Sequence, residues 1–383
     1  MALPFKAQII IFTMIRVILN TGLRMIFPFL AIFAKGLGVD IQRISLIISI
    51  SLVTSILGTF LAPSIDRRGR KIGMLLGMSI FTIGSGTIFF IPTYAMFFVG
   101  LLCMYLGTNI FTPSMLAYIG EKVTFSKRGT SVAITEISWS LSFIFVIPLV
   151  GFIMAAYSWS SPFLLLTILG IVTIVFLTWM LPKHKPQISP DTFTFQAIRK
   201  ALTQRSALAV MLMAFSALCG IGMINLMFGV WLGDTYHLQI TSLGVASSVL
   251  GIAELVGASL SAVFSDRLGK KRTIIWCIIL AVFVILLLPL FLRSITSALI
   301  WLFMFYIFSE YIIVSSMTLA TEVVIWARTT FISVFLASLT LGMGFGSYIA
   351  PYIYRTSFQA LSVVCGGLLL IALLALSQVK SNM

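Results

Sequence analysis

The sequence predicts an all-α membrane protein with twelve transmembrane helices in two six-helix bundles and both termini in the cytoplasm. The chain is 60% hydrophobic and only 9% charged, whereas soluble domains are roughly 45–50% apolar and about 25% charged. Its 383 residues divide into about twelve apolar runs, each near the roughly 20 residues that a membrane span needs. Short charged loops recur in the two halves of the chain, which predicts an internal repeat.

The first charged loop, 66–71, reads Asp-Arg-Arg-Gly-Arg-Lys, and the second, 266–271, reads Asp-Arg-Leu-Gly-Lys-Lys. Each stands between two long apolar runs, so we interpret each as a tight basic turn between two spans. The repeat extends to single residues, namely Asp66 and Asp266, Gly69 and Gly269, Arg70 and Lys270, Lys71 and Lys271, Glu121 and Glu322, and Arg128 and Arg328. Two halves with the same orientation are typical of parallel-repeat transporters.

The distribution of charge predicts the topology. With the N-terminus in the cytoplasm, most of the 25 Lys and Arg residues fall in cytoplasmic loops, as the positive-inside rule requires. The net charge of +15 therefore indicates membrane orientation, and we expect no nucleic-acid partner. We expect a multi-pass protein of the plasma membrane, in a bacterium the inner or cytoplasmic membrane.

The apolar runs predict six spans in each half. The first six are expected at about 5–33, 43–65, 72–91, 94–118, 129–155 and 161–181. The second six are expected at about 207–233, 242–264, 273–292, 298–322, 329–354 and 357–378. Residues 182–206, polar and proline-containing, predict a cytoplasmic linker between an N-terminal bundle, 1–181, and a C-terminal bundle, 207–383.

The loop motif resembles that of the major facilitator superfamily, Gly-x-x-x-Asp-Arg/Lys-x-Gly-Arg/Lys-Arg/Lys. It stands here at 62–71 and again at 262–271, with Ala62 and Ala262 where the family usually has Gly. The resemblance covers essentially the whole chain and is nearest to the drug:proton antiporter branch. Of that branch's motif in the fifth span only Pro148 and Gly151 match. The resemblance implies secondary transport by alternating access.

The same resemblance implies that the charged loops form a cytoplasmic gate. Asp66 is expected to hold Arg70 or Arg128, and Glu121 is expected to form a similar pair. The alternative is that these charges only enforce topology. The gate candidates are Asp66, Arg67, Gly69, Arg70, Lys71, Glu121, Arg128, Asp266, Arg267, Gly269, Lys270, Lys271, Glu322 and Arg328.

Charged residues within the spans are candidates for proton coupling, because a charge at the bilayer midplane costs about 2.5–3.5 kcal/mol on insertion scales. Arg16 and Glu136 lie at similar predicted depths, so we expect them to pair, with Glu136 exchanging protons as the cavity opens. A permanent structural ion pair is the alternative. Glu254 and Glu310 fall near the midplane, where they could attract a cation, exchange protons or stay neutral and hydrogen-bonded.

Polar and aromatic residues within the spans are candidates for the substrate cavity. They are Asn20, Arg24, Tyr105, Asn109, Trp139, Asn225 and Tyr306. Aromatic rings beside a carboxylate suit amphipathic or cationic compounds. For each aromatic residue, packing alone is the alternative.

We therefore expect a secondary active transporter, with proton-coupled efflux of an amphipathic organic compound or drug. The alternatives are a lysophospholipid or glycolipid flippase, in which Arg16 and Arg24 hold a phosphate, and a proton-coupled uptake symporter. An enzyme is not expected, because the chain has only two histidines and no metal-ligand spacing or ATPase loop. The expected partners are a small amphipathic substrate, protons and the lipid bilayer, with no cofactor or metal, and the protein is expected to be a monomer.

Overall fold

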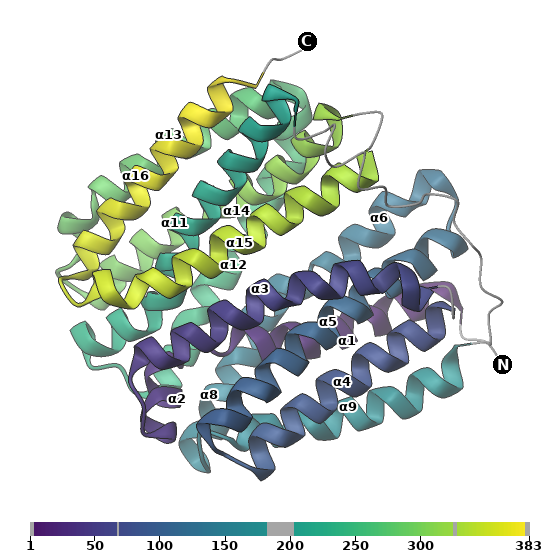
Figure 1. Cartoon of the computed structure of the whole chain (residues 1–383). Helices are drawn as coiled ribbons and strands as arrows, with labels where there is room; N and C mark the ends of the chain where they lie inside the picture. The colour runs from purple at the N-terminus through teal and green to yellow at the C-terminus, as the bar shows by residue number, and fades with distance from the viewer. Residues whose placement is uncertain (1–3, 67–68, 182–202, 325–327, 380–383) are drawn as a thin grey trace. The chain divides into compact units, whose positions relative to one another are not determined.

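The computed structural model describes residues 4–66, 69–181, 203–324 and 328–379, and all their regular elements are helical (Figure 1). Contacts divide the chain into two compact units. The first comprises Met1–Pro190 and Gln239–Gly251, and the second comprises Asp191–Leu238 and Ile252–Met383. The predicted boundaries of the linker, 182–206, remain a prediction, since most of that segment lies outside the described residues.

The helices follow the predicted apolar runs. Up to the linker they are α1 (Phe5–Arg24), α2 (Leu30–Leu37), α3 (Ile41–Asp66), α4 (Arg70–Phe90), α5 (Tyr94–Lys122), α6 (Phe125–Glu136), α7 (Ser138–Leu141), the π-helix η1 (Ser142–Val146), α8 (Ile147–Ala156) and α9 (Ser161–Met180). After it they are α11 (Arg205–Tyr236), α12 (Ile240–Leu268), α13 (Lys270–Leu286), the 3₁₀-helix η2 (Leu288–Phe291), α14 (Ile295–Val323), α15 (Arg328–Tyr354) and α16 (Phe358–Ser377).

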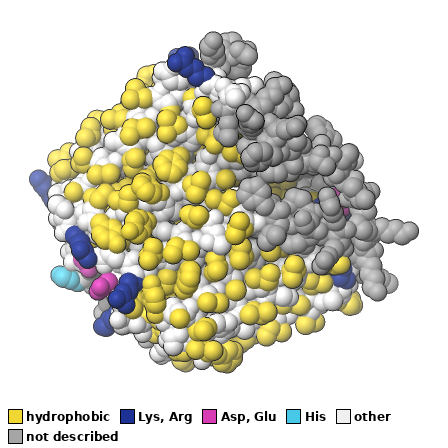
Figure 2. Space-filling view, in the orientation of Figure 1, with side chains coloured by type: hydrophobic (Ala, Val, Ile, Leu, Met, Phe, Trp, Pro, Cys, Tyr) yellow, Lys and Arg dark blue, Asp and Glu magenta, His cyan; other side chains and the backbone are white. Residues whose placement is uncertain are grey.

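The described helices confirm an all-α membrane fold. Ten are long and apolar enough to cross a membrane, and the bent pair of α2 with α3 makes up to eleven. The 17-residue α13, about 26 Å long, occupies the remaining predicted span. Hydrophobic side chains cover much of the face seen in Figure 2, and the charged ones lie near its edges. This distribution suits a surface surrounded by lipid.

The first span is shorter than predicted. A continuous helix over 5–33 is wrong, because α1 ends at Arg24 and α2 begins at Leu30. Pro28 has no N–H to donate to the Arg24 carbonyl, and the Phe27 N–H donates to that carbonyl instead, at 3.2 Å. The helix therefore stops next to the arginine.

The fifth span runs as one helix over Gly129–Ala156, as predicted, with a turn at Ile137 and a π-helical segment inside it. α6, α7, η1 and α8 follow one another within it. Pro148 cannot donate to the Ile144 carbonyl, and the Ser248 hydroxyl donates to that carbonyl at 2.8 Å. The Ile147 N–H reaches back five residues to the Ser142 carbonyl, which is the π-helical pattern.

Glycines allow two pairs of helices to approach closely. In the first unit, a Cβ added to Gly77 of α4 would lie 2.6 Å from the Gly107 carbonyl oxygen of α5. In the second unit, a Cβ on Gly346 of α15 would lie 2.1 Å from the Cys219 carbonyl oxygen of α11. Small residues that let backbones touch are typical of membrane helix pairs.

Candidate functional site

The candidate site begins with one polar face of α1. Thr13, Arg16, Asn20 and Arg24 are three or four residues apart, so they lie on the same face of the helix. All four side chains are buried. This face packs against α6 and α7, which places the polar residues of α1 opposite those of the fifth span.

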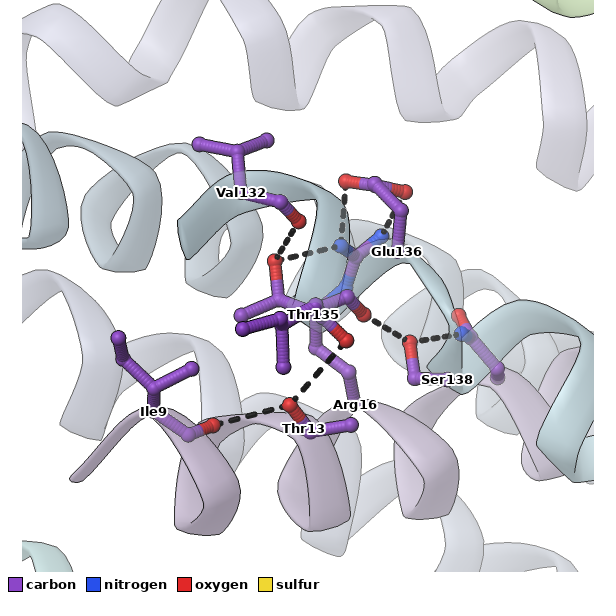
Figure 3. Close-up of polar contacts among 9 residues, drawn as sticks. Ile9, Thr13, Arg16, Val132, Thr135, Glu136 and Ser138 are labelled. Atoms are coloured by element: carbon purple, nitrogen blue, oxygen red, sulfur yellow. Dashed lines mark hydrogen bonds and ion pairs between the residues drawn. The ribbon is translucent and has the colours of Figure 1, made fainter. Parts of the chain in front are cut away.

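Arg16 and Glu136, predicted as partners, meet in a two-pronged ion pair (Figure 3). Arg16 Nη1 lies 2.5 Å from Glu136 Oε1, and Nη2 lies 2.9 Å from Oε2. Bidentate guanidinium–carboxylate pairs are among the strongest hydrogen-bonded contacts in proteins. The structure thus brings together the two residues that the sequence placed at similar depth.

The exposure of the two partners is very different. The Arg16 side chain is 8% exposed, whereas that of Glu136 is 51% exposed. Glu136 belongs to a candidate span, where charged groups almost always face the bundle interior or a water-filled cavity. Glu136 is therefore the exposed partner of the pair, and its role in proton coupling remains a prediction.

Hydroxyl groups surround the ion pair (Figure 3). Arg16 Nη1 also reaches Thr135 Oγ1 at 3.4 Å, and that hydroxyl donates to the Val132 carbonyl at 2.8 Å. From α1, Thr13 Oγ1 lies 2.9 Å from the Ile9 carbonyl oxygen and 3.4 Å from that of Ile134. These bonds hold the end of α6 against α1.

Two further candidates, Asn20 and Arg24, contact the segment that follows α6. Asn20 Nδ2 donates to Ser138 Oγ at 3.1 Å. Arg24 Nη1 donates to the Trp139 carbonyl at 2.7 Å, and its guanidinium carbon lies 4.2 Å from the Trp139 ring centroid and 3.6 Å from that of Phe143. Arg24 is thus held by two aromatic rings, and it is only 1% exposed.

The remaining candidates of the fourth span lie outside this hydrogen-bonded cluster. Tyr105 is buried in α5, and Asn109, one turn further, is partly exposed. Their assignment to a substrate cavity remains a prediction.

In the second unit, the structure joins Asn225 and Tyr306, with the Tyr306 hydroxyl 2.8 Å from Asn225 Oδ1. It also brings α12 close to Glu310 of α14. A Cβ on Gly257 of α12 would lie 3.0 Å from the Glu310 Cβ of α14, and Glu254 is one turn before Gly257. The sequence did not reveal the approach of Gly257 to Glu310, because the two residues are far apart along the chain and each lies in its own span.

The charged loops form matching ion pairs within each half. In the first unit, Arg70 Nε lies 2.9 Å from Glu121 Oε1. In the second, Lys270 contacts Glu322, and its Nζ lies 3.2 Å from Asp266 Oδ1. Burial lowers the pKa of Lys270, but hydrogen bonds to the two carboxylates more than offset this, so its pKa is raised. In each half, the ion pair therefore connects the start of the third span to the end of the fourth.

The last residue of each charged loop, Lys71 or Lys271, contacts backbone carbonyls at the end of a helix. Lys71 Nζ donates to the Thr178 carbonyl at 2.6 Å and also to the Leu181 carbonyl, at the end of α9. Lys271 Nζ donates to the Val379 carbonyl at 2.6 Å, just past the end of α16. A cation there satisfies the last carbonyls of a helix and suits its dipole. The sequence could not show this, because any carbonyl at the membrane edge is an equally good acceptor.

The rest of the predicted gate remains a prediction. Arg67 and the side chains of Asp66, Arg128 and Arg328 lie outside the described residues, and Arg267 is exposed. Gly69 and Gly269 have φ angles of 109° and 87°, which side-chain-bearing residues rarely adopt. Both loops therefore require glycine for their shape.

The gate can be tested at Asp66. We expect Asp66→Asn to reduce transport about tenfold, a cost near 1.4 kcal/mol, while the protein still inserts into the membrane. Uptake or efflux per inserted molecule measures this, with insertion checked by protease accessibility. Wild-type flux in the variant would contradict the gate and leave topology as the role of the charge.

Comparison with known proteins places the whole chain in one family. Residues 12–217 and 210–380 match the family model of the Major Facilitator Superfamily. The uncharacterized MFS-type transporter YwfA of Bacillus subtilis is 27% identical over 65% of this chain, and the match spans 61% of YwfA. Multidrug resistance protein MdtG of Proteus mirabilis is 25% identical over 70% of this chain and 69% of MdtG. The crystal structure of a D-xylose–proton symporter shares the fold, with a TM-score of 0.77 at 14% identity over 97% of each chain.

Proposed function

This chain belongs to the Major Facilitator Superfamily and is a secondary transporter, not an enzyme, and from this premise we propose that it exports an amphipathic organic compound in exchange for protons. Transport proceeds by alternating access, with Glu136 as the residue that carries the proton. The similarity to two multi-pass transporters of bacteria supports a bacterial cytoplasmic membrane as its location.

The observation that carries the proposal is the half-exposed carboxylate of Glu136 bound to a buried arginine. When Glu136 is ionised, Arg16 neutralises it through two short contacts. When a proton binds, the carboxyl group loses its charge and the guanidinium loses its partner. Proton binding therefore changes the balance of charge inside the membrane, and an exchanger can use such a change to couple two movements.

Export, rather than uptake, is favoured by the relatives. MdtG of Proteus mirabilis is named a multidrug resistance protein, and so are MdtG of Yersinia enterocolitica and of Serratia proteamaculans. These MdtG proteins are 25–26% identical to this chain. The YwfA match spans less than two thirds of that protein.

The cargo is proposed to be an amphipathic compound of modest size. Trp139 is 36% exposed and lies one turn from the Glu136 carboxylate, which places an aromatic surface beside an acid. Of the arginines that a flippase would use for a phosphate, Arg16 is engaged by Glu136 and Arg24 by the Trp139 carbonyl and two rings. These contacts favour drug-like cargo over a lysophospholipid.

The test is transport in proteoliposomes with an imposed pH gradient. A panel of amphipathic dyes and a fluorescent lysophospholipid are offered to wild type, Glu136→Gln and Asp40→Asn, the last a matched loss of an exposed carboxylate. We expect Glu136→Gln to reduce gradient-driven flux at least about tenfold. A tenfold change corresponds to about 1.4 kcal/mol. Exchange of labelled for unlabelled substrate without a gradient is expected to persist, and Asp40→Asn is expected to match wild type.

The outcomes separate the candidate functions. Substrate-driven proton movement that survives Glu136→Gln would exclude Glu136 as the proton carrier. Movement of the lysophospholipid alone, lost in Arg24→Ala and retained in Glu254→Gln, would instead support an anionic headgroup as cargo. Movement of the dye across the membrane in the same direction as the protons would support a symporter.

A further inference from the structure

We propose that the outer half of α15 binds an anionic phospholipid of the outer leaflet, with Arg355 and Tyr352 at the phosphate and the apolar side chains before them along an acyl chain. These residues belong to the second unit, whereas the pair of Arg16 and Glu136 belongs to the first. The inference concerns the lipid around the protein and is independent of the cargo and of the proton.

One face of α15 is exposed along the second half of the helix. Leu341, Phe345, Tyr348 and Tyr352 are 40%, 50%, 40% and 47% exposed, and Arg355, just past the end of the helix, is exposed as well. Their alternating spacing of four and three residues places these five side chains, the α15 stripe, on one side of the helix. The first four belong to a candidate span, where the apolar solvent is lipid.

The α15 stripe has the length of a lipid in one leaflet. The Arg355 N–H donates to the Pro351 carbonyl at 3.3 Å, so the chain continues the helical path as far as Arg355. Leu341 and Arg355 are therefore about 21 Å apart along the helix axis. Half of a bilayer, headgroups included, is about 20–22 Å thick. An arginine at headgroup level thus places Leu341 near the midplane, where an acyl chain ends.

The polar end of the α15 stripe offers several hydrogen-bond donors side by side. The ring centroids of Tyr348 and Tyr352 are 5.7 Å apart, and the Arg355 guanidinium carbon lies 5.9 Å from the Tyr352 ring centroid, within reach of a cation–π contact. A guanidinium binds phosphate through two parallel hydrogen bonds, and each phenol adds an O–H donor. This end therefore combines one positive charge with donors that suit a phosphate.

An arginine on the outer side of the membrane is uncommon. In the predicted topology few basic residues lie there, namely Lys35, Arg43, Arg293 and Arg355. Aromatic residues at the membrane interface anchor a helix whatever the headgroup, and such anchoring alone is the alternative role of the two tyrosines. A basic side chain beside them attracts anionic lipids. The site therefore prefers a headgroup with a net negative charge over a zwitterionic one.

Native mass spectrometry of the delipidated full-length protein tests the inference. Phosphatidylglycerol and phosphatidylcholine with the same acyl chains are titrated into wild type, Arg355→Gln, Tyr352→Phe and Arg293→Gln. The last is the matched control, because Arg293 is also exposed and lies on the same predicted side. We expect Arg355→Gln to weaken phosphatidylglycerol binding at least about tenfold and Tyr352→Phe about threefold, since hydrogen bonds to charged groups are stronger than neutral ones.

Phosphatidylcholine is expected to bind wild type and Arg355→Gln equally, and Arg293→Gln is expected to match wild type with both lipids. Equal melting temperatures of wild type and Arg355→Gln in lipid-free detergent check that the variant is folded, and phosphatidylglycerol should stabilise wild type more. Equal phosphatidylglycerol binding by these two proteins, or an equal loss in Arg293→Gln, would overturn the inference and leave interfacial anchoring. Displacement of the lipid by equimolar glycerol phosphate would contradict a role of the acyl chain.

Discussion

Gly346→Ala is expected to separate α15 from α11 and to lower the apparent melting temperature of the purified protein by about 5 °C or more. The added Cβ would lie 2.1 Å from the Cys219 carbonyl oxygen and 2.9 Å from its carbonyl carbon. Those atoms are backbone, so no side-chain rotation relieves the contact, and the two helices have to move apart. Thermal unfolding monitored by size-exclusion chromatography measures the effect.

Gly367→Ala is the matched control for this change. Gly367 lies in α16, and a Cβ there would meet nothing within 4 Å. Because Ala is favoured over Gly in a helix by about 1 kcal/mol, the control is expected to melt at or slightly above the wild-type temperature. Similar melting of Gly346→Ala and wild type would mean that α11 and α15 are not held at the described distance.

Arg24→Ala is expected to lower both the melting temperature, by about 5 °C, and transport, by at least about tenfold. The guanidinium occupies the space between the Trp139 and Phe143 rings, so alanine leaves a cavity there and deprives the Trp139 carbonyl of one donor. Unfolding curves and proteoliposome flux, normalised to folded protein, measure the two effects separately.

Arg24→Met separates the packing role of this residue from the role of its charge. Methionine refills the space between the rings and needs no counter-charge, so the melting temperature is expected to recover while transport does not. Arg43→Met, at an exposed arginine near the start of α3, is expected to change neither. Wild-type flux in Arg24→Met would assign Arg24 to packing alone.

The fold class was predictable because hydropathy and charge are properties of whole segments. The backbone groups of about twenty apolar residues in a row can all form hydrogen bonds in lipid only in a helix. The basic residues fix the side of the membrane on which each loop lies. Breaks within a span were harder to foresee. Pro28 and Pro148 are plain in the sequence, but proline in a membrane helix is tolerated wherever a neighbour satisfies the freed carbonyl. Whether Ser248 or water does so depends on packing.

The candidate site, like the fold, could be predicted only in part. The partnership of Arg16 and Glu136 followed from depth alone, because both are charges within spans and α1 and the fifth span lie in the same half. The aromatic contacts of Arg24 did not follow, since 32 phenylalanines offer many equivalent rings. The approach of Glu310 to α12 depends on Gly257, whose lack of a side chain lets α14 come close.

The lysines at the end of each charged loop have a consequence for the origin of the molecule. Lys71 fastens the end of α9, and Lys271 fastens the end of α16, so each half secures its last helix with its own loop. Because both partners of each contact lie in the same half, duplication of that half would keep the contact intact in each copy. Two copies with the same closing contact are what duplication of one segment would leave, in agreement with the repeated loops at 66–71 and 266–271.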